Sequence, residues 1–141
     1  MQRTHPKPPS RGRLPRYGAA LPAGSPQEPA AAGAESLDLF EWLAPHPEST
    51  FLIQVRGDSM AGAHIPDGAT VVVDRSLKAR SGSIVVALLD GEFTLKRLVR
   101  TPRAWVLHPE NPAYRPVEIS EEHPVEIWGV VRKVILDPSR L

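Results

Sequence analysis

The clearest indication of the fold is the segment Ser83-Ile-Val-Val-Ala-Leu-Leu-Asp-Gly-Glu-Phe-Thr-Leu-Lys-Arg-Leu-Val99. Two apolar runs rich in β-branched residues flank the dipeptide Asp90-Gly91, and an Asp-Gly connection is typical of a tight β-hairpin turn. We therefore predict two antiparallel strands. Period-2 alternation places Thr94, Lys96 and Leu98 on one face of the second strand.

Similar short apolar runs lie on both sides of this hairpin. They are Phe51–Arg56, Thr70–Asp74, Ala104–His108, Val117–Ile119 and Ile127–Leu136. Together with the hairpin they make roughly seven short strands over about 90 residues, which is typical of an all-β barrel or sandwich-like domain. Before the strands, Ser36 is suited to N-cap a short helix carrying Leu37 and Phe40. That helix must end near Ala44, because two prolines follow closely.

The first 36 residues differ from the rest in composition. They hold seven of the 16 prolines, five basic and two acidic residues, and Tyr17 as their sole aromatic residue. Proline removes backbone donors, and so few large apolar groups do not offset the entropy of ordering the chain. We predict an extended Pro-rich arm over residues 1–36 and a β domain over residues 37–141.

Composition excludes several classes of protein. Lys and Arg number 17 against 16 Asp and Glu, a net charge of +1 that argues against a protein built to coat nucleic acid. The absence of Cys excludes disulfides, thiolate nucleophiles and Cys-ligated zinc. The five His are scattered, so neither a metal nor another cofactor is expected. Without a membrane-spanning run or a signal-peptide core, a soluble cytoplasmic protein with no membrane partner is expected.

Two side chains are candidates for nucleophilic catalysis. Ser59 follows a predicted strand in the turn Gly57-Asp58-Ser59-Met60, where the backbone can present a hydroxyl outward. A serine that caps its own turn is the simpler interpretation of these residues alone. Lys96 could supply the base, since burial on a strand face lowers the pKa of an ammonium group. An ordinary edge-strand lysine with its head in water is the alternative.

Three segments, in this order and spacing, resemble the Ser/Lys autoprotease domain shared by LexA-type repressors and UmuD proteins (peptidase S24). They are Gly57-Asp-Ser-Met60, Ile65-Pro-Asp-Gly68 and Asp90-Gly-Glu-Phe-Thr-Leu-Lys-Arg-Leu98. The likeness also includes His46-Pro47, Asn111-Pro-Ala-Tyr-Arg-Pro116 and Trp128-Gly-Val-Val131, so that it covers residues 23–136. The short arm makes the chain more similar to UmuD. The resemblance implies that Ser59 is the nucleophile and Lys96 its base.

The resemblance also implies a substrate within the chain, because family members cut themselves at an Ala-Gly or Cys-Gly bond in the N-terminal segment. Ala-Gly pairs occur at Ala23-Gly24, Ala32-Gly33 and Ala61-Gly62. The third pair lies beside the proposed nucleophile and cannot bend back to it. Ala23-Gly24 stands 36 residues before Ser59, a spacing that keeps the resemblance free of gaps. It is the predicted cleavage site, and flanking prolines favour the extended chain that a protease needs.

By the same resemblance, the protein acts in the SOS response to DNA damage. A RecA–single-stranded-DNA filament is expected to stimulate cleavage. The trimmed homodimer is then expected to assist a Y-family, UmuC-like DNA polymerase in translesion synthesis. No sequence-specific DNA binding is expected, since a 36-residue Pro-rich arm cannot hold a helix-turn-helix. The alternative is a non-catalytic binding module whose basic arm contacts nucleic acid or an acidic protein, with Ser59 and Lys96 serving structural roles.

Overall fold

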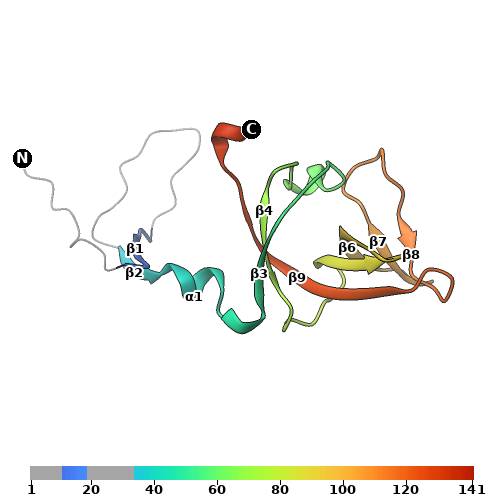
Figure 1. Ribbon diagram of the computed structural model, residues 1–141, viewed down its shortest axis with the longest axis horizontal. Coiled ribbons are helices and arrows are strands. Elements are labelled where there is room, and N and C mark those ends of the chain that lie inside the picture. Colours follow the sequence, from blue (N-terminus) through green and yellow to red (C-terminus); the bar gives the residue numbers. More distant parts are fainter. Residues whose placement is uncertain (1–10, 19–33) are drawn as a thin grey trace, which may run out of the picture. The chain divides into compact units, whose positions relative to one another are not determined.

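The computed structural model describes residues 11–18 and 34–141, and the chain divides into two units, Met1–Pro45 and His46–Leu141. In the first unit, strand β1 (Arg13–Arg16) pairs antiparallel with β2 (Glu35–Asp38), and β2 leads into helix α1 (Leu39–Leu43) (Figure 1). The helix ends where the following prolines predict.

The predicted start of the helix is wrong. Ser36 lies in β2, where its hydroxyl accepts a hydrogen bond of 2.9 Å from Arg13 Nε. Asp38 caps the helix instead, and its carboxylate accepts a bond of 3.1 Å from the Glu41 amide. Pairing with β1 keeps residues 35–38 extended, so the helix begins two residues later than an N-cap at Ser36 predicts.

The second unit is built on a seven-stranded antiparallel sheet (Figure 1). Its strands are β3 (Thr50–Gln54), β4 (Thr70–Asp74), β5 (Ile84–Leu89), β6 (Glu92–Arg100), β7 (Trp105–His108), β8 (Val117–Glu118) and β9 (Val125–Ile135). Short 3₁₀ turns lie at η2 (Pro47–Ser49), η3 (Ala61–Ala63) and η4 (Pro138–Arg140). The strand order is β3-β4-β9-β5-β6-β7-β8, so the C-terminal strand separates β4 from β5. The predicted all-β class is confirmed.

The predicted hairpin forms β5 and β6. Leu89 pairs with Glu92, which leaves Asp90 and Gly91 as the two turn residues. Both have positive φ, 50° and 80°, the left-handed backbone that the inner positions of a tight hairpin turn require. The Asp-Gly dipeptide therefore sets the register that brings Lys96 opposite Val85.

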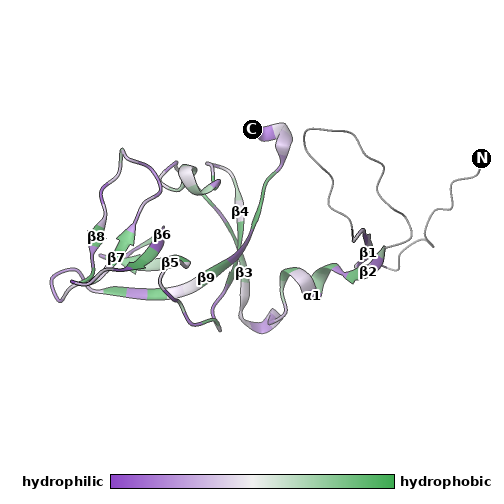
Figure 2. Cartoon of the chain, turned by 180° about the vertical axis from the view of Figure 1, so that it is seen from behind, coloured by the Kyte–Doolittle hydropathy of each residue, from purple (hydrophilic) through white to green (hydrophobic). Residues whose placement is uncertain are grey.

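Apolar side chains are buried on both faces of the sheet. One core cluster is made by Met60, Ile65, Ala69, Val71, Val73 and Val86, and the other by Val85, Ala87, Leu98, Leu107 and Val130. Adjacent residues of β5 enter different clusters, as the period of a strand requires. Hydrophilic residues gather instead on the connections that flank β8 (Figure 2). Met60 is 1% exposed, so the residue after Ser59 anchors the turn in the core.

The end of β4 carries a fully buried carboxylate, Asp74. Its Oδ1 accepts hydrogen bonds from the Ser49 hydroxyl and from the amide and hydroxyl of Ser76, and its Oδ2 lies 2.6 Å from His46 Nδ1. Burial by itself raises the pKa of Asp74, but the bonds from Ser76, His46 and Ser49 outweigh it and hold that pKa well below the usual range. The network joins η2 to β4.

Substitution Asp74→Ala is expected to lower the free energy of unfolding by about 3 kcal/mol, because it removes a fully buried carboxylate together with the hydrogen bonds that it accepts from Ser49 and Ser76. Urea unfolding followed by circular dichroism measures the change. Asp137→Ala is the matched control. Asp137 accepts hydrogen bonds from the amide and the hydroxyl of Ser139, as Asp74 does from Ser76, but it lies exposed. The control is expected to cost clearly less than Asp74→Ala, because water replaces the bonds of an exposed carboxylate. Equal losses for the two variants would contradict the role given to burial.

Because folding lowers the Asp74 pKa, the contribution of the ionised carboxylate to the free energy of unfolding is present at neutral pH and is lost as pH falls through the acid range.

Candidate active site

Ser59 stands on a turn between β3 and η3. Gly57 begins the turn with φ of 91°, which favours glycine, and its amide donates to the Asp67 carboxylate at 2.7 Å. Asp58 is exposed, Ser59 is half-buried and Met60 is buried. The turn therefore holds the Ser59 hydroxyl at the surface, between the exposed Asp58 and the buried Met60.

Lys96 reaches this turn from β6. Its Nζ donates hydrogen bonds to Ser59 Oγ at 3.0 Å, to Thr94 Oγ1 at 3.0 Å and to the Leu95 carbonyl at 3.1 Å. Thr94 lies two residues before Lys96, on the same face of the strand, as the alternation predicts. The structure thus brings Ser59 and Lys96 within hydrogen-bonding distance, although they are 37 residues apart in the sequence.

The surroundings of Lys96 favour its neutral form. Its side chain is half-buried, and this burial lowers the pKa of the ammonium group. Among residues 11–18 and 34–141, no ion pair with a carboxylate offsets that effect. A neutral amine has a lone pair that can accept the Ser59 proton, so this geometry is suited to a nucleophile and its base.

The connection between β7 and β8 packs against the Ser59 turn. The Glu110 amide donates to the Ser59 carbonyl at 2.8 Å, and the Gly62 amide donates to the Glu110 carbonyl at 2.7 Å. A Cβ at Gly62 would stand 2.5 Å from that carbonyl oxygen, so the close approach requires glycine. The Glu110 carboxylate in turn pairs with Arg97 of β6. Backbone bonds therefore join the turn to this connection on both sides of Met60.

The same connection contributes two side chains that sequence reasoning did not assign to the site. The Tyr114 hydroxyl donates to Asp58 Oδ1 at 2.6 Å, and Asn111 Nδ2 donates to the Asp58 carbonyl at 2.9 Å. The Tyr114 ring centroid lies 6.0 Å from Lys96 Nζ. The signal for both residues was the segment Asn111–Pro116, which carries part of the family resemblance.

Two hollows are lined by residues that contact Lys96 or the Ser59 turn, although Ser59 and Lys96 themselves, called the dyad below, line neither. A groove of about 280 Å³ has the dyad's neighbour Thr94 in its wall; it is lined by Ile53, Gln54, Val55, Arg56, Val71, Val86, Phe93, Thr94 and Leu95. A larger hollow of about 520 Å³ includes Tyr114 and Glu110. An extended peptide segment needs such an open, partly apolar groove beside the reactive hydroxyl.

The predicted cleavage bond, Ala23-Gly24, lies outside the described residues, as does the alternative Ala32-Gly33. The third pair begins η3, where the Ala61 amide donates to the Asp58 carbonyl at 3.1 Å and Gly62 packs on Glu110. This pair is thus built into the folded turn. Within the described part of the chain, no helix has the length and apolar character needed to cross a membrane.

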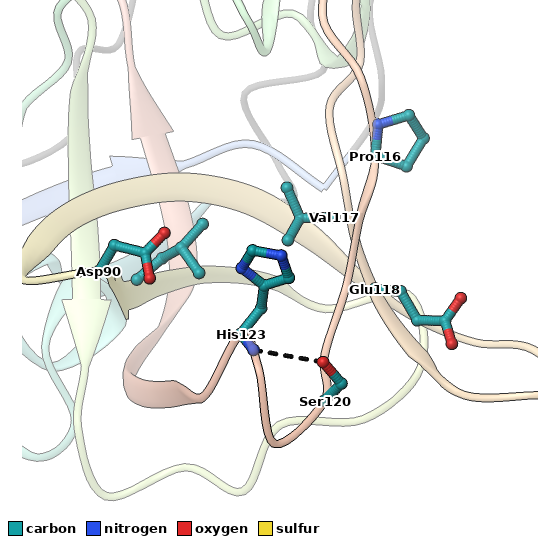
Figure 3. Close-up of a pocket in the computed structure, with 7 residues that line it drawn as sticks. Asp90, Pro116, Val117, Glu118, Ser120 and His123 are labelled. Carbon is teal, nitrogen blue, oxygen red and sulfur yellow. Dashed lines mark hydrogen bonds between the residues drawn. The ribbon is translucent and has the colours of Figure 1, made fainter.

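Another hollow, of about 320 Å³, lies at the turn between β5 and β6 and the connections around β8 (Figure 3). Asp90, Glu118, Ser120 and His123 supply its polar atoms, and the His123 amide donates to Ser120 Oγ at 3.2 Å. Neither Ser59 nor Lys96 lines it.

Comparison with known proteins gives concordant matches. The family model described as Peptidase S24-like matches residues 15–132. Protein MucA of Salmonella typhimurium is 39% identical over 125 residues, which are 88% of this chain and 85% of that protein. Protein SamA of the same species is 40% identical over 127 residues, 90% and 88% of the two chains. LexA repressor 2 of Pseudomonas putida is 48% identical over 80 residues, 57% of this chain and 40% of the repressor.

Proposed function

Because this chain belongs to the Peptidase S24-like family, we propose that it is a self-cleaving serine protease in which Ser59 is the nucleophile and Lys96 the base. The observation that carries the proposal is the 3.0 Å contact between Lys96 Nζ and Ser59 Oγ. A solvent-facing Ser on a turn has no need of a half-buried lysine, whereas a nucleophile needs a base within hydrogen-bonding distance.

In the proposed reaction, neutral Lys96 removes the Ser59 proton and Oγ attacks the carbonyl carbon of Ala23. Backbone N–H groups of the turn stabilise the oxyanion of the tetrahedral intermediate. Lys96 then gives its proton to the leaving amine of Gly24, and the peptide bond breaks to leave an acyl-enzyme ester. Water, deprotonated by Lys96, hydrolyses this ester and restores the Ser59 hydroxyl. One turnover per chain is sufficient, since the substrate is the chain itself.

The groove beside Thr94 supports a substrate in the form of an extended peptide. Ile53, Val55, Phe93 and Leu95 give it apolar walls. Pro22 and Pro26 favour an extended backbone on both sides of the Ala23-Gly24 bond, and the small side chains at the bond permit a close approach to Ser59. The arm of residues 1–36 is therefore the proposed substrate of the β domain.

We further propose that cleavage is a switch in the SOS response. The matches to MucA and SamA extend along most of both chains, which favours a UmuD-like role over that of a repressor. A RecA–single-stranded-DNA filament stimulates the cut, and the trimmed homodimer assists a Y-family polymerase in the cytoplasm. Removal of residues 1–23 takes away five basic and no acidic residues, so the formal charge changes from +1 to −4. This change alters the surface offered to partners.

Incubation with RecA, single-stranded DNA and a nucleoside triphosphate is expected to yield a fragment beginning Gly24-Ser25-Pro26. Intact mass and N-terminal sequencing identify the bond. Ala23→Glu is expected to block the cut, since a bulky charge cannot approach the nucleophile closely, while the matched variant Ala32→Glu leaves it unchanged. A fragment beginning Gly33 would move the site to Ala32-Gly33. The absence of cleavage with and without the filament would favour the non-catalytic binding module.

A further inference from the structure

Within the described part of the chain, Tyr114 is the side chain that contacts both Asp58, which precedes the proposed nucleophile, and Lys96, the proposed base. Its hydroxyl binds the Asp58 carboxylate, and its ring faces Lys96 Nζ. We infer that Tyr114 is a positioning residue for self-cleavage: it holds the Ser59 turn in place through Asp58, and its ring covers the amine of Lys96. This inference rests on the proposed function.

The hydrogen bond from Tyr114 to Asp58 is short and charge-assisted. At 2.6 Å from a carboxylate oxygen it belongs to the strong class of O–H···O⁻ bonds. The bond to Asp58 raises the pKa of Tyr114, which favours the protonated phenol that donates this bond.

Tyr114 does not act from a free loop. Its own amide donates to the Asn111 carbonyl at 3.1 Å, while Asn111 Oδ1 accepts from the Ala113 amide at 3.0 Å. Asn111 holds the Asp58 carbonyl, and Glu110 holds the Ser59 carbonyl. One short, internally bonded segment therefore fixes both residues of the turn. The Tyr114 bond is the member of this set that restrains the Asp58 side chain.

The hydrogen bond between Tyr114 and Asp58 contributes more to the placement of the Ser59 turn than to the stability of the domain. Both partners are exposed, with Tyr114 at 43%, so water replaces the bond readily in an unfolded or variant chain. The rate of cleavage is far more sensitive to the position of the Ser59 hydroxyl, because a displacement of about 1 Å at a nucleophile can cost on the order of 10²-fold in rate. Loss of the bond is therefore expected to slow cleavage without loosening the domain.

The ring has a separate effect on Lys96. Nζ lies 6.0 Å from the ring centroid, at the outer limit of a cation–π contact, so the ring acts mainly by keeping water from the amine. The amine is hydrogen-bonded to Ser59, Thr94 and the Leu95 carbonyl. The charged groups on the adjoining elements are the Asp58 carboxylate of the turn and the Arg97–Glu110 ion pair of β6 and the β7–β8 connection. A smaller side chain at position 114 admits water and favours the ammonium form.

The test compares variants of the full chain for self-cleavage between neutral and alkaline pH. Tyr114→Phe keeps the ring, so its rate is expected to fall about 10-fold while the midpoint of the pH profile stays in place. Tyr114→Ala is expected to be slower still, with its midpoint moved to higher pH. The urea midpoint of Tyr114→Phe is expected to match that of the wild type. Ser139→Ala removes an exposed bond of the same length to Asp137 and is expected to cleave at the wild-type rate.

A double-mutant cycle isolates the bond. If Tyr114 acts through Asp58, then Asp58→Ala combined with Tyr114→Phe is no slower than Asp58→Ala alone. Wild-type cleavage in Tyr114→Phe, or additive losses in the cycle, would overturn the inference and leave the proposed protease intact. A wild-type chain that does not cleave would overturn both.

Discussion

Substitution Ser59→Ala is expected to abolish self-cleavage, with a loss of rate on the order of 10³-fold or more. The variant lacks the oxygen that forms the acyl-enzyme, and no other described hydroxyl apart from Thr94 is bonded to Lys96 Nζ. The domain is expected to remain folded, because the anchor of the turn is the neighbouring Met60. Intact mass after incubation with the RecA filament, and separately at alkaline pH, gives the readout.

Ser120→Ala is the matched control for this experiment. Ser120 is also a loop serine whose hydroxyl makes a local bond, but it lies in the hollow at β8 and not beside Lys96 (Figure 3). Its loss is expected to leave the rate unchanged. Cleavage of a folded Ser59→Ala chain at the wild-type rate would exclude the serine mechanism.

Substitution Lys96→Met is expected to slow cleavage by about 10²–10⁴-fold, the usual contribution of a positioned base. Methionine retains most of the length and apolar stem of lysine but cannot take a proton. Since burial lowers the Lys96 pKa, the charged amine disfavours the folded state, and the variant is expected to unfold no more easily than the wild type. Loss of activity is then not a consequence of unfolding.

The pH profile identifies the base in the wild-type chain. Only neutral Lys96 can accept the Ser59 proton, so the rate of spontaneous cleavage is expected to rise with pH. The rise is expected to begin below the usual lysine range, because burial lowers the pKa. Lys96→Met is expected to lose this rise. A rate that is flat or falls from neutral to alkaline pH in the wild type would point to a different base.

The strands were readable from the sequence because their signals are local. Alternation and the Asp90-Gly91 turn depend on neighbours a few residues apart, and the hairpin register agrees with them. The start of α1 was misread because Ser36 is held extended by Arg13, a partner 23 residues away. Nothing in the residues around Ser36 indicates that pairing.

The contacts of the candidate site were also difficult to predict from the local sequence. The residues around Ser59 favoured a serine capping its own turn, and the pairing with Lys96 was expected only from the family resemblance. The contributions of Asn111 and Tyr114 were missed, because the residues of a loop do not reveal which turn, 53 to 56 residues away, it packs against. Contacts of that range come from the sheet topology.

The place of β9 in the sheet has a consequence for the timing of cleavage during synthesis. Ser59 follows β3 and Lys96 lies on β6, and in the strand order these are joined through β4, β9 and β5. The central member of that series is made from residues 125–135, near the end of the chain. A nascent chain thus has the proposed substrate, the arm of residues 1–36, long before it has the strand that lies between β4 and β5 and so brings Ser59 and Lys96 together. Under the proposed function, each molecule completes the non-local pairing of β9 before it cuts itself, so an incomplete chain is expected to be protected from its own chemistry.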